Sequence, residues 1–298
     1  MWPAMAPFPV ISSVRAPRPA GHLSPARPLL AIVSPGPHTP EPAHRSLAAD
    51  LDEALRADHL RLHRQPIVDG ATGEVVGAEA LVRWRHPQRG LLPPLSFVEL
   101  ADQCGLASAL DTWVLHRACA DAVSWSGTLA GLPVSVNLSA SHLADRATVA
   151  LISDACARSG LDPRRLVLEV TETALVPSAT RGAAVLGALR ELGARVSLDD
   201  FGTGHSTLAR LRALPVDEIK IDQTFVAGLP SGSTDRAIVR SMIMLAHDLG
   251  IGVVAEGVET AEQRAALLAL GCVRMQGFLF GHPEPVRVAL VPAPRTGA

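Results

Sequence analysis

From Ser46 onward, short apolar runs alternate with amphipathic helical patterns along the chain. Two β-rich runs come first, LRLHRQPIVD at 60–69 and EVVGAEALVRW at 74–84, and the GATG between them predicts a hairpin. Further apolar runs bounded by turn residues predict six more strands, at 132–137, 165–170, 194–200, 217–222, 252–257 and 273–277. Helical periodicity fills the connections, most clearly at 96–105, 111–125, 181–193 and 233–250.

This order of elements favours a parallel α/β barrel. Strands that alternate with helices form parallel sheets, and six strand-and-helix units after a hairpin suit closure into a barrel. An open doubly wound sheet is the competing architecture, but no Gly-rich GxGxxG turn follows the first strand to support it.

The chain ends depart from this pattern and suggest three segments. Eleven of the 24 prolines fall within the first 42 residues, a density that forbids regular helix and sheet ladders. We therefore expect a disordered Pro-rich tail at 1–45, one folded domain at 46–288 and a flexible C-terminal tail at 289–298. The proline-rich segment also has no apolar run long enough to cross a bilayer.

Composition narrows the function classes. At 298 residues and 48% hydrophobic content, the chain can bury a barrel-sized core. Its net charge of −2 and the lack of a long basic run argue against duplex nucleic acid or an anionic membrane surface as partner. Four widely spaced cysteines form no CxxC pair, so we expect reduced, buried thiols in a cytoplasmic protein rather than a disulfide framework.

Polar groups gather at the carboxyl ends of the predicted strands. They are Asn137, Glu169, Asp199, Asp200, Lys220, Asp222, Glu256 and Gln276, and Glu79 at the end of VVGAE can join them. In a barrel these ends share one face. So many neighbouring carboxylates suppress one another's ionisation unless cations are bound between them.

The donor types indicate which cation. The candidates are oxygen donors without histidine or cysteine, which favours Mg²⁺ or Mn²⁺. Adjacent aspartates suit a pair of ions, since one carboxylate can bridge while its neighbour binds the second ion. A lysine beside them offsets negative charge that develops on phosphate. The residues alone therefore predict a metal-dependent hydrolase of a phosphate ester.

Seven short motifs, taken in order, closely resemble the EAL-domain family. They are EALVRW at 79–84, VNLSA at 136–140, LEVTET at 168–173, LDDFGTG at 198–204, IKID at 219–222, VVAEGVET at 253–260 and MQGFLF at 275–280. The resemblance covers about residues 47–287. It implies a modified (β/α)₈ TIM-type barrel with one antiparallel strand, a homodimer, and hydrolysis of cyclic di-GMP to linear pGpG.

The resemblance also implies a role for each matching residue. The first metal ion would take Glu79, Asn137, Glu169 and Asp199, and the second Asp199, Asp200 and Glu256. Lys220 would hold the attacking water, and Glu256 would act as general base. The residues implied to contact substrate are Gln65, Arg83, Asp222 and Gln276. Glu172 and Glu259 would support the metal ligands, Glu172 by tethering the DDFGTG loop.

Several of these residues have plainer interpretations. Asp222 could instead cap the following helix, Gln65 could satisfy backbone groups, and Arg83 could pair with a neighbouring carboxylate. The dipeptide His247-Asp248 resembles the metal motif of another phosphodiesterase class, but the other histidines form no ligand set with it, so we interpret it as structural.

The sequence also departs from the family pattern. Arg64 and His205 stand where the family commonly has tyrosine, and GHPEP at 281–285 replaces an SRP-type ending. None of these changes removes an implied metal ligand. The alternative to an active enzyme is a degenerate EAL module that binds cyclic di-GMP or a protein without turnover.

Overall fold

The first two strands form a long antiparallel hairpin that starts and closes the sheet. The computed structural model describes residues 42–171, 173–175, 179–203, 211, 214–229 and 232–285. In it, β1 (Leu60–Asp69) pairs with β2 (Val75–His86) along almost its whole length. Since β2 runs on past Glu79 to His86, the hairpin extends beyond the level at which β2 meets its parallel neighbour.

Parallel strands complete the barrel. They are β4 (Val134–Asn137), β5 (Leu166–Thr171), β6 (Arg195–Phe201), β7 (Glu218–Ile221), β8 (Gly252–Ala255) and β9 (Arg274–Gln276). The order β1-β9-β8-β7-β6-β5-β4-β2 returns to β1 and is therefore closed. Because β1 is antiparallel to both β2 and β9, the barrel has the single reversed strand that the family resemblance implies, and the predicted fold class is confirmed.

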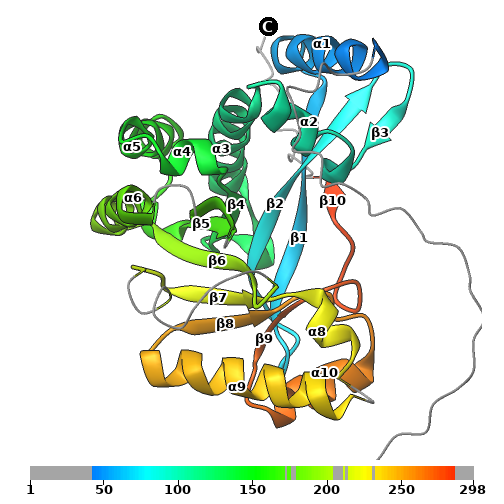
Figure 1. Ribbon diagram of the computed structural model, residues 1–298, viewed down its shortest axis with the longest axis vertical. Helices are drawn as coiled ribbons and strands as arrows, with labels where there is room; N and C mark the ends of the chain where they lie inside the picture. Colours follow the sequence, from blue (N-terminus) through cyan, green and yellow to red (C-terminus); the bar gives the residue numbers. More distant parts are fainter. Residues whose placement is uncertain are drawn as a thin grey trace, which may run out of the picture. The chain divides into compact units, whose positions relative to one another are not determined.

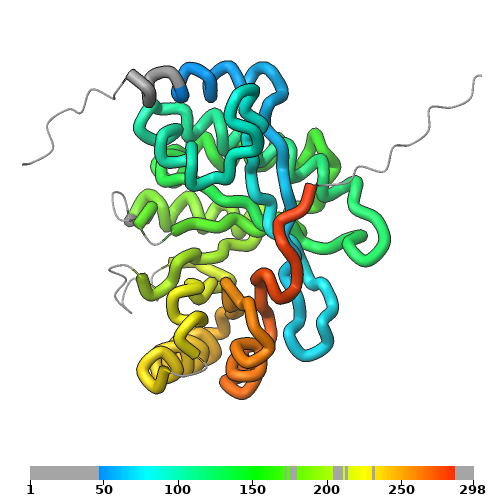
Figure 2. Tube along the Cα trace, turned by 90° about the vertical axis from the view of Figure 1, so that its right-hand side faces the viewer, coloured from blue at the N-terminus to red at the C-terminus, as the bar shows by residue number. Residues whose placement is uncertain are grey.

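Two short strands flank the hairpin outside the closed ring. β3 (Gly90–Leu92) pairs with β2, and β10 (Glu284–Pro285) pairs with β1. Figure 2 shows the segment after β9, in orange and red, running alongside the blue and cyan hairpin.

Helices surround the strands (Figure 1). They are α1 (Pro42–Arg56), α2 (Val98–Gln103), α3 (Ala107–Ser124), α4 (Ala140–Leu143), α5 (Ala147–Ser159), α6 (Ala179–Leu192), α8 (Gln223–Ala227), α9 (Ser233–Leu249) and α10 (Ala261–Ala269), with 3₁₀ turns η1 (Pro94–Ser96), η2 (Gly127–Leu129), η3 (Pro163–Arg165) and η4 (Thr173–Leu175). α3 lies against β4, α6 against β6, and α9 against β7 and β8. α1 begins at Pro42, before Ser46, where the sequence pattern places the start of the domain.

The strands are apolar because they are covered on both faces. Every residue of β5 up to Val170 is buried, including Glu169, and all of β7 is buried, including Lys220. Continuous apolar runs of this kind are typical of parallel strands packed between a barrel interior and its helices. A charged side chain inside such a run needs partners, and these charged residues find them in one another.

The cysteine expectation is correct in part. The four cysteines are free thiols, but Cys104 at the end of α2 is exposed, whereas Cys119, Cys156 and Cys272 are buried. Cys104 follows the short α2 directly, as its C-cap, and the turn there leaves the side chain in solvent.

Candidate active site

Lys220 lies at the centre of the polar groups that the strands present. Its side chain is only 1% exposed, and its Nζ lies 2.5 Å from Glu256 Oε1 and 2.9 Å from Glu169 Oε2. Glu79 Oε2 and Asp199 Oδ1 are each 3.6 Å away. We call these five residues the Lys220 cluster. The cluster joins β2, β5, β6, β7 and the residue after β8, so the barrel brings together side chains far apart in the sequence.

One ammonium cannot balance four carboxylates in a buried site. Burial and the nearby carboxylate of Glu79 hold the pKa of Glu169 well above its ordinary value. Burial also raises the pKa of Glu256 to about 7, against the opposing effect of Lys220. Without a further cation, the cluster therefore favours protons on Glu169 and Glu256 at pH values where isolated glutamates are charged.

For two further members, Glu79 and Lys220, the pKa shifts in the direction that favours the charged form. Burial alone would raise the pKa of Glu79, but the ammonium of Lys220 and the amide donors of Gln276 and Asn137 hold it below its ordinary value. Burial alone would lower the pKa of Lys220, but the surrounding carboxylates, Glu169 first, hold it well above its ordinary value. Lys220 is therefore a permanent positive charge in this site.

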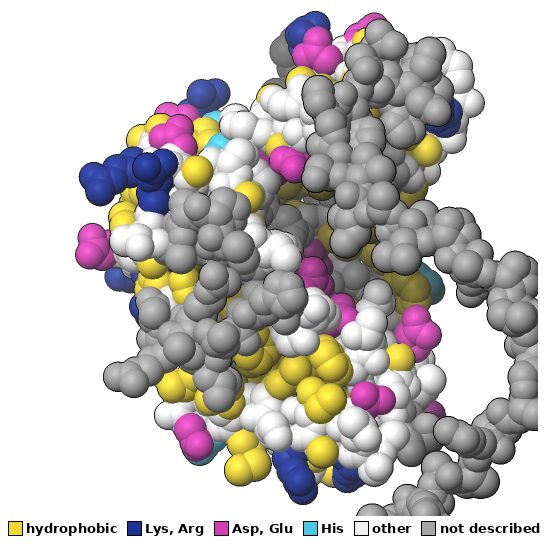
Figure 3. All heavy atoms as spheres, in the orientation of Figure 1, with side chains coloured by type: hydrophobic (Ala, Val, Ile, Leu, Met, Phe, Trp, Pro, Cys, Tyr) yellow, Lys and Arg dark blue, Asp and Glu magenta, His cyan; other side chains and the backbone are white. Residues whose placement is uncertain are grey.

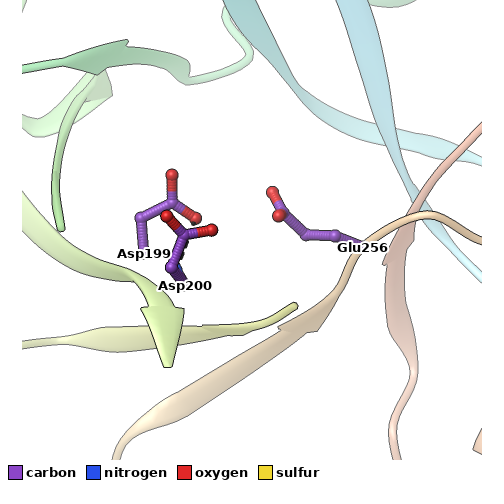
Figure 4. A group of neighbouring side chains, drawn as sticks. All are labelled: Asp199, Asp200 and Glu256. Carbon is purple, nitrogen blue, oxygen red and sulfur yellow. Dashed lines mark hydrogen bonds between the residues drawn. The ribbon is translucent and has the colours of Figure 1, made fainter. Parts of the chain in front are cut away.

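A backbone irregularity lets two adjacent aspartates serve one site. Neighbouring side chains of a regular strand point to opposite faces. At the end of β6, the β6–β7 register shifts between Leu198 and Phe201, and Asp200 has a left-handed backbone with φ of 54°. This kink redirects the side chains, and carboxylate oxygens of Asp199, Asp200 and Glu256 all lie within 4.8 Å of one another (Figure 4).

A chain of side-chain amides fixes Glu79 from both sides. Asn137 Nδ2 donates to Glu79 Oε1 at 2.9 Å, and Gln276 Nε2 donates to Glu79 Oε2 at 2.6 Å. Gln276 Nε2 also donates to Gln65 Oε1 at 3.1 Å, and Gln65 Nε2 donates to the Gly281 carbonyl at 3.1 Å. Gln65 and Gln276, which the family resemblance implies to be substrate contacts, therefore hold a predicted metal ligand and the segment after β9.

The donor set fits divalent cations. Glu169 Oε1 is buried and makes no hydrogen bond, although burying an unpartnered carboxylate oxygen is costly. The nearby oxygens come from carboxylates and from the Asn137 amide, and hard cations such as Mg²⁺ and Mn²⁺ prefer such ligands. Figure 3, drawn in the orientation of Figure 1, shows acidic side chains in a hollow at the middle of the molecular surface.

Arg83 lies on the same face of β2 as Glu79. Side chains alternate along a strand, so Glu79, Leu81 and Arg83 share one side, and Arg83 lies nearer the open end of the hairpin. Its guanidinium is partly buried and donates to the Val82 carbonyl at 2.8 Å. It makes no ion pair within the described residues, and the phosphate contact implied for it stays a prediction.

Asp222 makes the capping contact that the sequence left open. Its side chain accepts from the Thr224 N–H at 2.9 Å and caps α8. Glu259 is exposed before α10, and its backbone N–H donates to Gln263 at 2.7 Å. Glu172 and His205 lie outside the described residues. Their predicted roles, and the substrate contact predicted for Asp222, stay predictions.

His63 was missed by the sequence analysis. It lies on β1 two residues before Gln65, is 9% exposed, and its Nδ1 lies 3.1 Å from the Pro283 carbonyl oxygen. Burial lowers its pKa. Strand alternation, which places positions 63 and 65 on one face, was the available signal.

A cleft of about 590 Å³ opens beside Asn137. Its walls are mainly apolar and come from β2, η1, α2 and α3, with Asp111 among the few charged groups. This volume suits a small organic ligand. A larger hollow of about 830 Å³ lies along α1 and α3 around Trp113, and no member of the Lys220 cluster lines it.

The structure gives no support to a metal site at the dipeptide His247-Asp248. His247 and Asp248 are 87% and 76% exposed at the end of α9. The one group of potential metal-ligating residues among the described side chains is Asp199, Asp200 and Glu256. None of the helices within the described ranges is both long and apolar enough to cross a membrane.

Comparison with known proteins identifies the family. Residues 48–283 match the sequence profile of the EAL domain. The chain is 47% identical over 240 residues to the cyclic di-GMP phosphodiesterase NbdA of Pseudomonas aeruginosa, covering 80% of this chain and 30% of NbdA. It is 46% identical over 242 residues to an uncharacterized signaling protein of Caulobacter vibrioides, covering 81% and 30% of the two chains.

A solved structure agrees with this match. The PaMucR phosphodiesterase in complex with c-di-GMP superposes with a TM-score of 0.76 at 42% identity, covering 80% of this chain and 98% of that chain. The present chain spans less than a third of the length of NbdA and of the Caulobacter protein, so the similarity concerns their EAL portion.

Proposed function

Because the chain belongs to the EAL-domain family, we propose that it is a metal-dependent phosphodiesterase that hydrolyses cyclic di-GMP to linear pGpG. The observation that carries this proposal is the Lys220 cluster together with Asn137, which donates to Glu79, and Asp200, which lies beside Asp199 and Glu256. Apart from Lys220, these residues fill every ligand position implied by the family with an oxygen donor. The relatives named as phosphodiesterases support the substrate.

Two groups of residues would hold the cations. Glu79, Asn137, Glu169 and Asp199 would bind one, and Asp199, Asp200 and Glu256 the other. When bound, Mg²⁺ or Mn²⁺ would neutralise phosphate charge and lower the pKa of an attacking water. The amides of Asn137 and Gln276 contribute by fixing Glu79 before any ligand arrives, so little reorganisation is needed.

The remaining side chains would act on substrate. Arg83 can form charge-assisted hydrogen bonds with a phosphate of cyclic di-GMP. Lys220 carries a permanent charge beside the site of bond cleavage and offsets the negative charge that develops there. Glu256, which contacts Lys220, can accept the proton of the attacking water. The cleft beside Asn137 has room for part of a nucleotide.

The same proposal includes a cytoplasmic location and a homodimer. The unpaired thiols agree with a reducing compartment, and the family resemblance supports the dimer. Sedimentation equilibrium of the purified chain would measure the oligomeric state, and a mass equal to one chain at micromolar concentration would refute the dimer.

The proposed activity has a direct test. Purified protein is incubated with cyclic di-GMP and Mg²⁺ or Mn²⁺, and the nucleotides are separated by chromatography. We expect pGpG to accumulate, EDTA to abolish its formation, and Ca²⁺ to support it poorly because the looser coordination of Ca²⁺ misplaces reacting oxygens. Undiminished turnover in excess chelator would refute the role of the metals.

Glu256→Gln tests the role of the Glu256 carboxylate in the same assay. It keeps size and hydrogen bonding but removes the basic carboxylate, so kcat should fall at least about 10²-fold, the lower range for general acid–base catalysis. Binding of cyclic di-GMP in Ca²⁺, measured by calorimetry, should weaken far less. If wild-type protein binds cyclic di-GMP without turnover in any divalent metal, the chain is a binding module and not a phosphodiesterase.

A further inference from the structure

The turn after β9 is held rigidly at both of its ends. At its start, Val258 N–H donates to the Gln276 carbonyl at 3.0 Å, and Leu279 N–H donates back to the Val258 carbonyl at 3.0 Å. Gly277 packs so closely here that a Cβ would collide with the Val258 backbone. At its end, Gln65 Nε2 donates to the Gly281 carbonyl at 3.1 Å. The turn 277–281 is therefore fixed to the loop after β8 and to β1.

These anchors place the turn at the rim of the Lys220 cluster. Val258 is two residues beyond Glu256, and the Gln276 side chain, immediately before the turn, donates to Glu79. His63 contacts the Pro283 carbonyl oxygen just beyond the turn, at 3.1 Å. Anything attached to this turn is positioned by the same residues that position a metal ligand.

Phe278 projects an aromatic ring from this turn into solvent. The chain is only 3% aromatic, and Phe278, at 52% exposure, is the only aromatic side chain among the exposed large hydrophobic residues of the described ranges. Its ring stacks in a tilted arrangement with His282, with centroids 4.2 Å apart and an interplanar angle of 32°. The contact with His282 limits the rotation of the ring, so its orientation is defined while much of its surface stays free.

We propose that Phe278 is a stacking platform for one purine base of the dinucleotide substrate. An exposed aromatic ring on a rigid support next to a phosphate-cleaving centre suits a base, since every nucleobase has a π-face that stacks on an aromatic side chain. The cleft beside Asn137 is lined by the middle of β2 and the end of β4, whereas Phe278 follows β9, so the two base-sized features belong to different strands of the barrel. The inference rests on the proposed function, because it assumes a substrate that carries purines.

The test compares four substitutions by steady-state kinetics with cyclic di-GMP and Mg²⁺. Phe278→Ala should raise KM at least about fivefold, the lower bound for losing one base–aromatic stack, with kcat changed less than about twofold. Phe278→Trp should keep KM near wild type because it keeps a π-face. Phe278→Leu should behave like Phe278→Ala because it keeps apolar area but no ring. Leu279→Ala is the matched control, since Leu279 is a 38% exposed aliphatic neighbour on the same turn.

A spectroscopic measurement separates stacking from support of the turn. In Ca²⁺, cyclic di-GMP should quench the emission of Phe278→Trp more than that of wild-type protein, as a stacked guanine does. An unchanged KM in Phe278→Ala, or equal losses in Phe278→Ala and Leu279→Ala, would refute the platform.

Failure of the proposed function gives a different result. If wild-type protein binds cyclic di-GMP without turnover, the phosphodiesterase proposal fails, and the dissociation constants of the same four variants still decide on the platform. If wild-type protein neither binds nor hydrolyses cyclic di-GMP, both proposals are wrong.

Discussion

Asp200 combines a strained backbone with a chemically demanding side chain. Left-handed φ values cost most residues about 1–2 kcal/mol, whereas Asp and Asn tolerate them because their short polar side chains bond locally. Asp200, with φ of 54°, therefore meets two separate requirements, one for the turn and one for the metal site. Substitutions at this position can separate the two.

Asp200→Asn and Asp200→Ala should differ in stability but not in activity. Asn keeps the left-handed conformation, so its free energy of unfolding should stay near wild type. Ala should unfold about 1 kcal/mol more easily because its Cβ is strained there. Both variants should lose turnover because both lack the Asp200 carboxylate, which is one of the implied ligands of the second cation. Urea denaturation and the pGpG assay measure the two effects, and equal stability of both variants would show that the strain is absent in solution.

At the scale of elements, β7 and β8 each present a polar end, and a helix cap then fixes the chain that follows it. β7 ends at Ile221, and Asp222 immediately caps α8. β8 ends before Glu256, and the loop after it is closed by a capping box in which Thr260 and Gln263 bond reciprocally at the start of α10. The chain direction is thus fixed within a few residues of Lys220 and of Glu256, which helps to keep these side chains in place.

Substitution of Asp222 tests this arrangement. Asn is as good a helix cap as Asp, so Asp222→Asn should be about as stable as wild type, while Asp222→Ala should lose about 1 kcal/mol. If Asp222 also contacts substrate, as the sequence predicts, both variants should lose activity. Thermal denaturation and the pGpG assay together distinguish the roles: full activity in Asp222→Asn would leave the cap as its only role.

The elements were largely predictable from the sequence, and the contacts between their side chains were not. Apolar runs bounded by polar groups identified the strands, because parallel strands covered on both faces consist mainly of apolar residues. The runs also located Lys220 and its carboxylates, since polar groups inside them are conspicuous. The contact of Gln276 with Glu79 depends on the closure of the barrel between β9, β1 and β2, which no local pattern contains. The kink at Asp200 depends on register with β7 and was equally invisible.

At the scale of the whole molecule, the barrel concentrates negative charge that its fold alone does not neutralise. The Lys220 cluster holds four carboxylates and one ammonium, and Lys220, Glu79 and Glu169 are buried while Asp199 and Glu256 are partly exposed. Folding without cations must therefore take up protons, and binding of cations must release them. The stability of the protein is coupled to pH and to metal through the same groups.

Metal-free protein should become less stable between about pH 5 and pH 8, relative to Glu256→Gln. Burial raises the pKa of Glu256 from 4.5 to about 7, so in this window the folded chain binds a proton that the unfolded chain has lost. Raising the pH removes that proton and lowers the free energy of unfolding, by an amount on the order of 2 kcal/mol. Gln cannot titrate, so the variant should show a shallower slope.

Thermal denaturation across this pH range, in EDTA and in saturating Mg²⁺, measures the effect. Mg²⁺ should flatten the wild-type curve because a bound cation favours the charged carboxylate. Parallel curves for wild type and Glu256→Gln in EDTA would contradict the raised pKa.

The backbone at Asp200 has a consequence for how such a barrel diverges over evolutionary time. A lineage that no longer needs catalysis can replace Asp200 by Asn or Gly at little cost in folding, since both accept left-handed φ. Replacing Lys220 would instead remove the ammonium that pairs with the buried Glu79 and Glu169, and breaking a buried ion pair in this way typically costs about 3–5 kcal/mol. Descendants that keep the fold as binding modules are therefore expected to lose the aspartate first and to retain the lysine longest.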